Sequence, residues 1–369
     1  MLKSVEKYQK ALSLEPYADR TEMPVYPQIN AAAGSLGGKT QAEIFFDAEA
    51  WLEALDATYA LIGKPDMGFA EAPGDGAFGM AMVCRAPGRD LGENELYQFI
   101  ETPYIQDSAE YKVINEMGYG AWRVKYLMDI QTPPMTDPGQ LFAKFGEVGR
   151  NSAKVREFYA KRDIEISAHA ATMPIFDTLS LDRTMMEFTC DLYEDPGPIM
   201  DIIANYQEEE TVNTIKRLRD SHGERVAIFA MRSSSAFLSP DAFDEYAWPA
   251  LKRMIETFHA AGIMVVLHAD SNWVPMLDRL IQLPKKSVHV ELDEENDIFA
   301  AYEILRGWHS IRGNVPAGLF AFGTPDDICS YCEPLVEMGM SGGFILGSSC
   351  DIPLNAKPEN VKAMIDMVR

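Results

Sequence analysis

Positive charge is scarce in this sequence. Its 369 residues include 33 lysines and arginines against 56 aspartates and glutamates, so the formal net charge is −23. A surface this acidic repels nucleic-acid phosphates and anionic lipid headgroups, so we expect neither a nucleic acid nor a membrane as partner. Hydrophobic residues make up 47% of the chain, which is enough for a large core.

Long apolar runs and a cysteine framework are also missing. No stretch reaches the roughly 18 consecutive apolar residues that a membrane span needs. Residues 1–20 lack the apolar segment of a secretory signal. The five cysteines are an odd number without regular spacing, so we expect reduced thiols in a cytoplasmic protein.

Short apolar runs alternate with longer segments that have helical periodicity. The runs predict eight strands, at 25–29, 66–70, 164–170, 226–231, 263–268, 287–292, 310–315 and 343–348. The clearest helix follows Ser239, a natural N-cap, with Pro240 at the first helical position. Pro249 is expected to kink this helix.

This alternation predicts a (β/α)₈ TIM barrel in a single domain over residues 1–369. Residues 1–20 are expected to form a helix that packs outside the barrel. Residues 71–163 interrupt the alternation, so we interpret them as an insertion that caps one barrel end, with helices near 108–119 and 142–158.

Polar or potentially ligating side chains gather where six consecutive predicted strands end. They are His169, Met231, Arg232, His268, Asp270, Asn272, Glu291, Asp293, Asn314, Ser348, Ser349 and Cys350. Because the active sites of TIM barrels lie at the carboxyl ends of the strands, we predict the site at this end.

His268 and Asp270 are two residues apart on an extended chain, so their side chains should point the same way. Cys350 follows the strand three further along and could close the set. Nitrogen, oxygen and sulfur ligands together suit Zn²⁺. Simpler interpretations stay open: a hydrogen-bonded structural His268, a helix cap at Asp270, and a buried apolar Cys350.

Three long segments, 237–270, 311–328 and 342–369, resemble the uroporphyrinogen decarboxylase superfamily, and residues 23–40 match it more loosely. The resemblance implies a (β/α)₈ barrel. True decarboxylases of this superfamily carry an arginine motif on the first strand that grips substrate carboxylates. Here that position reads "VYPQINAAAG", without arginine, so decarboxylation is disfavoured.

The other branch of the superfamily comprises methyltransferases that exchange a methyl group with a corrinoid protein. Those that methylate thiols hold zinc through a histidine–any–cysteine motif and a distant cysteine, which correspond here to His268, Asp270 and Cys350. One thiolate with a carboxylate leaves a harder, more Lewis-acidic ion, better matched to oxygen than to sulfur.

The continuation "DSNW", residues 270–273, resembles the subgroup of corrinoid-linked demethylases. This resemblance implies transfer of a methyl group from a methoxylated, aromatic substrate to the Co(I) corrinoid of a separate protein. Zn²⁺ or an acid, with His268, Asp270 and Glu291 as the catalytic candidates, would stabilise the leaving oxygen. The substrate-binding candidates are His169, Met231, Arg232, Asn272, Trp273 and Asn314.

Four alternatives stay open: methyl transfer from the corrinoid to a thiol, transfer to tetrahydrofolate, uroporphyrinogen-type decarboxylation, and a non-catalytic binding protein. A homodimer is also left open.

Overall fold

The computed structural model describes residues 2–69, 74 and 82–369. Residue 70 of the strand expected at 66–70, and residues 71–73 and 75–81 of the expected insertion, lie outside the described part. Among the described residues the main sheet is parallel and contains β1 (Val25–Gln28), β6 (Ala170–Thr172), β7 (Arg225–Phe229), β8 (Met264–Ala269), β9 (Val288–Leu292), β10 (Ser310–Val315) and β11 (Phe344–Asp351).

Two short strands complete the ring. β2 (Met67–Gly68) pairs in parallel with β5 (Glu165–Ile166), and the backbone N–H of Asp66 donates to Val25 O of β1 at 3.1 Å. The third predicted strand is therefore divided: β5 pairs with β2, and β6 pairs with β7. The barrel closes through this divided strand, and every predicted strand has a counterpart, which confirms the predicted (β/α)₈ class.

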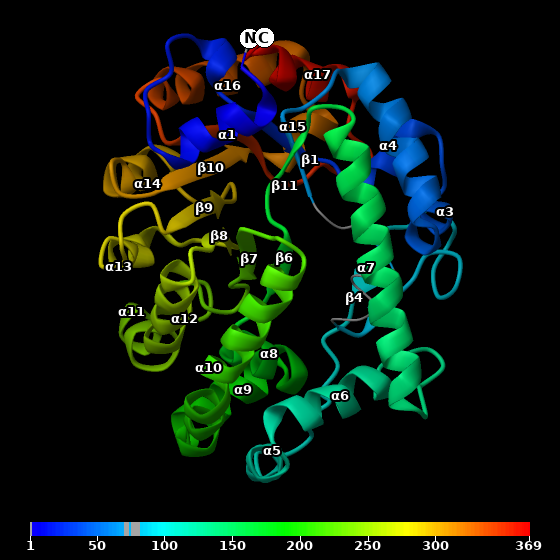
Figure 1. The fold of residues 1–369 in the computed structure, drawn as a ribbon, viewed down its shortest axis with the longest axis vertical. Coiled ribbons are helices and arrows are strands. Elements are labelled where there is room, and N and C mark those ends of the chain that lie inside the picture. Colours follow the sequence, from blue (N-terminus) through cyan, green and yellow to red (C-terminus); the bar gives the residue numbers. More distant parts are fainter. Residues whose placement is uncertain (1, 70–73, 75–81) are drawn as a thin grey trace.

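Helices surround the sheet (Figure 1). They are α2 (Ala32–Gly37), α3 (Gln41–Phe46), α4 (Ala48–Ile62), α8 (Ile175–Arg183), α9 (Met185–Glu194), α10 (Gly197–Asp220), α11 (Pro240–Ala242), α12 (Trp248–Ala260), α13 (Leu277–Leu280), α14 (Ile298–Leu305), α15 (Ala317–Phe322), α16 (Pro325–Gly339) and α17 (Pro358–Asp366). Their apolar faces and most apolar strand residues form one large core, while Ala168, Ala227 and Val266 form a second, small cluster. The apolar strand runs of the sequence are explained by burial in these two clusters.

The N-terminal helix α1 (Ser4–Leu12) lies at the amino ends of the strands. Tyr8 donates a hydrogen bond to Ser167 O at 3.0 Å, and the buried ammonium of Lys7 pairs with Asp66 at 3.1 Å. Arg369 at the other end of the chain also reaches Asp66, at 3.1 Å. One buried carboxylate thus ties both ends of the chain to the base of the barrel.

Ser239 caps its helix as predicted, since its hydroxyl accepts a hydrogen bond from the N–H of Ala242 at 3.2 Å. The helix changes type along its length. A π-helical turn (Phe243–Ala247) separates α11 from α12, and Pro249 falls in the first turn of α12. Proline lacks an N–H and cannot donate to an α-helical ladder, so the irregularity expected at Pro249 takes the form of this wider turn just before it.

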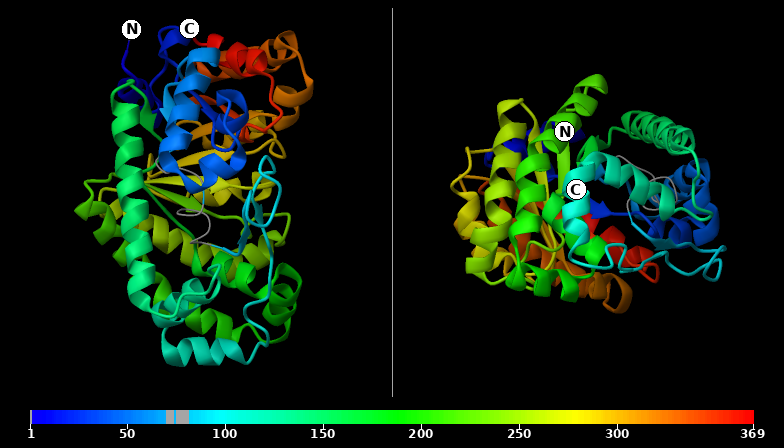
Figure 2. Two further views of the ribbon diagram at one scale, coloured as in Figure 1. Left: turned by 90° about the vertical axis from the view of Figure 1, so that its right-hand side faces the viewer. Right: turned by 90° about the horizontal axis from the view of Figure 1, so that it is seen from below.

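The segment between β2 and β5 contains α5 (Glu110–Met117), α6 (Tyr119–Asp129) and the 23-residue α7 (Pro138–Ala160). A small antiparallel pair, β3 (Cys84–Arg85) with β4 (Gln98–Phe99), precedes them. Figures 1 and 2 show α7 running along one side of the molecule, with α5 and α6 at the end far from the chain termini. Within the described residues, no helix is long and apolar enough to cross a membrane.

Candidate metal centre

Three charged side chains stand next to one another on neighbouring strands of the barrel. In the parallel ladders His268 of β8 is opposite Glu291 of β9, and Glu291 is opposite Arg312 of β10. All three are at least nine-tenths buried. Residues in register on adjacent strands point to the same face, so this row lies inside the barrel near the carboxyl ends.

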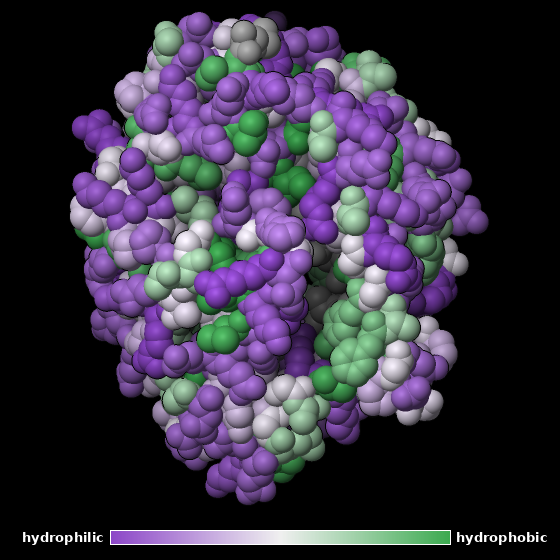
Figure 3. Space-filling view, in the orientation of Figure 1, coloured by the Kyte–Doolittle hydropathy of each residue, from purple (hydrophilic) through white to green (hydrophobic). Residues whose placement is uncertain are grey.

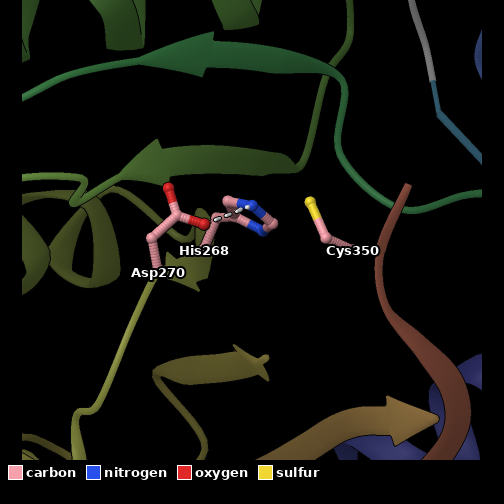
Figure 4. Close-up of side chains that lie close together, drawn as sticks. All are labelled: His268, Asp270 and Cys350. Carbon is pink, nitrogen blue, oxygen red and sulfur yellow. Dashed lines mark ion pairs between the residues drawn. The ribbon is translucent and has the colours of Figure 1, made fainter. Parts of the chain in front are cut away.

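His268, Asp270 and Cys350 converge at this end (Figure 4). One ligand atom from each lies within 4.8 Å of the others. The Nε2 atom of His268 is 3.2 Å from a carboxylate oxygen of Asp270. His268 is buried, whereas Asp270 and Cys350 are half-buried, so the open side of the group faces away from the strands.

The donor set fits a zinc ion. At Zn–N and Zn–O distances of about 2.0–2.2 Å and a Zn–S distance of about 2.3 Å, tetrahedral ligand atoms lie roughly 3.3–3.7 Å apart. Contraction of the present cluster by about 1 Å at its widest would therefore be enough. Three protein ligands leave one position for a substrate, as catalytic zinc sites require.

Glu291 fixes the orientation of the His268 ring. Its Oε2 atom is 2.9 Å from Nδ1 of His268, and its Oε1 atom is 3.4 Å from Nε of Arg312. When Nδ1–H donates to the carboxylate, the Nε2 lone pair faces Asp270 and Cys350. A carboxylate behind a ligating histidine is a recurrent feature of zinc sites.

The electrostatics of this row favour charged side chains. Burial alone lowers the pKa of His268, but the charge of Asp270 and hydrogen bonds with Asp270, Cys350 and Glu291 raise it well above its usual value. Burial alone raises the pKa of Glu291, but Arg312 and His268 bring it down to about 2.

The helix after β8 does not use Asp270 as its cap. The side-chain oxygen of Asn272 accepts the N–H of Val274 at 3.1 Å, and Asn296 accepts the N–H of Trp273 at 2.7 Å. The capping interpretation of Asp270 is therefore wrong, and its carboxylate is directed to His268 instead.

Several predicted substrate-binding residues serve the architecture of the loops. Trp273 is fully buried and packs edge-on against Phe243. Asn314 is 1% exposed and donates to the backbone oxygens of Asp293 and Asn296 at 3.2 and 3.0 Å. The loop after β9 thus engages the side-chain amide of Asn314, whereas Phe243 packs against the ring of Trp273.

Arg232 and Met231 follow β7 and are half-buried. Arg232 pairs with Glu101 of the 71–163 segment at 3.0 Å, and its backbone N–H donates to the buried Asp177 at 2.6 Å. Arg232 therefore joins the segment to the carboxyl end of the barrel. Its guanidinium already has an acidic partner there.

The predicted position of His169 at a carboxyl end is wrong. The strand continues to Thr172, and the N–H of His169 donates to Arg225 O, at the start of β7. In the β7–β8 ladder Arg225 is opposite Met264, four residues before His268. Because a strand rises about 3.3 Å per residue, His169 lies roughly 13 Å away along the barrel.

Sequence reasoning missed two groups beside the centre. One is Arg312, whose position in an apolar strand signals a buried partner. The other is Asp351, which accepts hydrogen bonds from Gln28 at 2.7 Å and Asn30 at 2.5 Å. Burial raises the pKa of Asp351 to about 6 despite these bonds. Polar residues at the end of the first strand were the available signal for this second group.

The family model for uroporphyrinogen decarboxylase (URO-D) matches residues 177–369. Methylcobamide:CoM methyltransferase MtbA of Methanosarcina acetivorans is 19% identical over 172 residues, which are 46% of this chain and 49% of that protein. The chain thus spans about half the length of this curated relative.

A solved structure of a methyltransferase from Methanosarcina mazei matches the whole fold, with a TM-score of 0.72 and 17% identity. The match covers 100% of this chain and 98% of that one. The family model covers more than half of the chain, and the chain belongs to the uroporphyrinogen decarboxylase family. The two similar proteins are both methyltransferases by name, in line with the expected resemblance to the corrinoid-dependent methyltransferase branch of the family.

Proposed function

We propose that this protein is a methyltransferase that exchanges a methyl group with the corrinoid of a separate protein. The two similar proteins described above are both methyltransferases, one of them acting on a methylcobamide by its name. The convergence of His268, Asp270 and Cys350 at the barrel end supports the proposal, since it gives the fold a place to activate a methyl donor or acceptor.

We further propose that the methyl donor is a methoxylated, aromatic compound. The observation that carries this is the donor set: one thiolate, one carboxylate and one imidazole make a harder centre than two thiolates would. Such a centre prefers an ether oxygen to a thiol. Zn²⁺ bound there would act as a Lewis acid on that oxygen.

Chemically, the methyl–oxygen bond breaks and a methyl–cobalt bond forms with the electron pair of Co(I). The oxygen keeps the bonding pair and takes a proton from water as the alcohol or phenol leaves. His268, Asp270 and Cys350 would hold the metal, and Glu291 would hold the His268 ring in the required orientation. The half-buried side of the group admits the substrate, while the buried row behind it excludes water.

The corrinoid protein must approach the same end of the barrel. Exposed apolar side chains occur on the helices of the 71–163 segment, including Phe142, at 61%, and Met117, at 47% exposure. Figure 3 shows a mostly hydrophilic face with apolar groups beside a central hollow. Apolar groups on an acidic surface are where a protein partner would gain buried area.

A second candidate is transfer in the opposite direction, from a methylated corrinoid to a thiol. The name of the relative MtbA favours it, because coenzyme M is the acceptor given there. Asp270 argues against it, since a carboxylate ligand leaves a bound thiol less nucleophilic than a second thiolate would.

The deciding experiment combines metal analysis with a cobalt assay. We expect about one zinc per chain, lost in His268→Ala and weakened in Cys350→Ser. Purified protein, a reduced corrinoid protein and a panel of methoxyarenes should convert Co(I) to methyl-Co(III), followed by visible absorption. Methylation of thiols from methyl-Co(III), without any demethylation of methoxyarenes, would favour the second candidate and overturn the first.

A further inference from the structure

Arg312 is an unusual residue for a barrel interior. Its side chain is fully buried, yet within the described residues its Nε and Nη2 atoms have no hydrogen-bond partner. Its Nη1 atom donates one long bond of 3.3 Å to Gln28, and the guanidinium lies 4.6 Å from the centre of the Tyr26 ring. A buried charge with so few hydrogen bonds costs free energy, so a purely structural role explains it poorly.

Within the described part of the chain, Glu291 is the one carboxylate that forms an ion pair with Arg312. The two carboxylate oxygens of Glu291 have different partners: Oε1 faces Arg312 at 3.4 Å and Oε2 faces His268 at 2.9 Å. Rotation of the carboxylate would break one contact or the other. The position of Arg312 therefore determines which carboxylate oxygen of Glu291 contacts the His268 imidazole, and how the carboxylate plane is oriented.

The surroundings leave Arg312 little freedom. A Cβ atom on Gly347 would lie 2.6 Å from Cγ of Arg312, so a glycine is required at this position of β11 to make room for the arginine. Tyr26 covers one face of the guanidinium, and Gln28 holds Nη1. Contacts from β1, β9 and β11 thus fix a side chain that does not itself reach the ligand group.

We propose that Arg312 is a positioning residue of the metal centre, acting through Glu291 to align the His268 imidazole with the metal. This inference rests on the proposed function, because it takes His268 as a metal ligand. Groups behind a ligating histidine typically change metal affinity by about 10- to 100-fold when they are removed.

The test measures Zn²⁺ affinity and the absorption spectrum of the Co²⁺-substituted protein. Arg312→Met keeps the bulk but removes the charge, and its dissociation constant for Zn²⁺ should rise about 10- to 100-fold. The ligand-field bands of bound Co²⁺ should also shift, because the imidazole is no longer held in one orientation. Arg312→Lys keeps a cation beside Glu291 and should recover part of the affinity; it also serves if Arg312→Met does not fold.

Two controls separate positioning from general damage. Arg225→Met removes another buried arginine, paired with Glu165 at the opposite barrel end, and should leave the Co²⁺ spectrum unchanged. Glu291→Gln should weaken Zn²⁺ binding like Arg312→Met, and the double variant should bind no more weakly than Glu291→Gln alone, because both changes act on one contact.

The outcomes are distinguishable. Failure of the unmodified protein to bind Zn²⁺ or Co²⁺ would refute the metal centre of the proposed function. Normal affinity and an unshifted Co²⁺ spectrum in Arg312→Met would refute the role of Arg312 alone. Additive losses in the double variant would refute action through Glu291.

Discussion

Replacement of Gly347 by alanine tests the packing behind the metal centre. The added methyl group would lie 2.6 Å from Cγ and 2.9 Å from Cδ of Arg312, and 3.4 Å from Tyr26 O. Carbon atoms in contact prefer about 3.5–4.0 Å, so Arg312 has to move by roughly 1 Å. The backbone of Gly347 has no positive φ, and alanine itself adds no backbone strain there.

Overpacking of a tight interior typically costs about 1–3 kcal/mol, and we expect a loss in this range for Gly347→Ala in urea unfolding. Displacement of Arg312 should also weaken Zn²⁺ binding about tenfold or more, measured by competition with a chelator. Gly318→Ala is the matched control. Nothing lies within 4 Å of its added methyl group, and because Gly318 is exposed in the first turn of α15, alanine should stabilise by at most about 0.5–1 kcal/mol.

The cost of Gly347→Ala should largely disappear in an Arg312→Ala background, because the clashing atoms are then gone. If Gly347→Ala is as stable as the unmodified protein and binds Zn²⁺ with the same affinity, the reasoning is refuted. An equal loss of stability on Gly347→Ala with and without Arg312 would show that the added methyl group clashes with other atoms.

Three further changes test other parts of the structure. Asp270→Cys supplies a second thiolate, so Zn²⁺ should bind more tightly while demethylation of methoxyarenes slows; unchanged rates would contradict the role of Asp270. Asp66→Ala leaves Lys7, 1% exposed, without its ion-pair partner and should cost about 3–5 kcal/mol in urea unfolding, where a loss below about 1 kcal/mol would contradict the argument. The exposed pair of Lys362 with Asp366 provides the comparison, since Asp366→Ala should cost at most about 1 kcal/mol. Burial raises the pKa of Asp177 to about 6, so the folded state keeps a proton that the unfolded chain releases near pH 4. Asp177 should therefore contribute a fall of up to about 3 kcal/mol in the unfolding free energy as pH rises from about 4 to above 6, and Asp177→Asn should make the total fall smaller by that amount. Asp182 and Asp351, whose pKa burial also raises to about 6, should keep their own contributions in this variant.

Much of the fold is local enough to be predicted from the sequence. The apolar runs of β7 to β11 had to be strands buried on both faces, and Ser239 with Pro240 defined a helix start from residue type alone. The spacing of His268 and Asp270 on an extended chain predicts that both side chains lie on one face. Cys350 joined them because all parallel strands of a barrel end on the same side.

Where a strand really ends depends on its neighbours. The sequence around His169 looks like a finished strand, but the ladder with β7 carries the chain on to Thr172 and leaves His169 near the amino end. From residue type alone, Asn314 and Trp273 are plausible substrate-binding groups. In the structure the side-chain amide of Asn314 donates to the loop after β9, and Phe243 packs against Trp273.

What the sequence by itself determined was the number and order of the strands and three ligand atoms at one end. Tertiary structure decided which side chains contact and orient the ligating residues. Register between β8, β9 and β10 placed Glu291 and Arg312 next to His268, and a glycine on β11 made room for the arginine. Such contacts join residues far apart in the chain, and no local periodicity encodes them, because hydrogen-bond register and side-chain volume are set only when the strands pair.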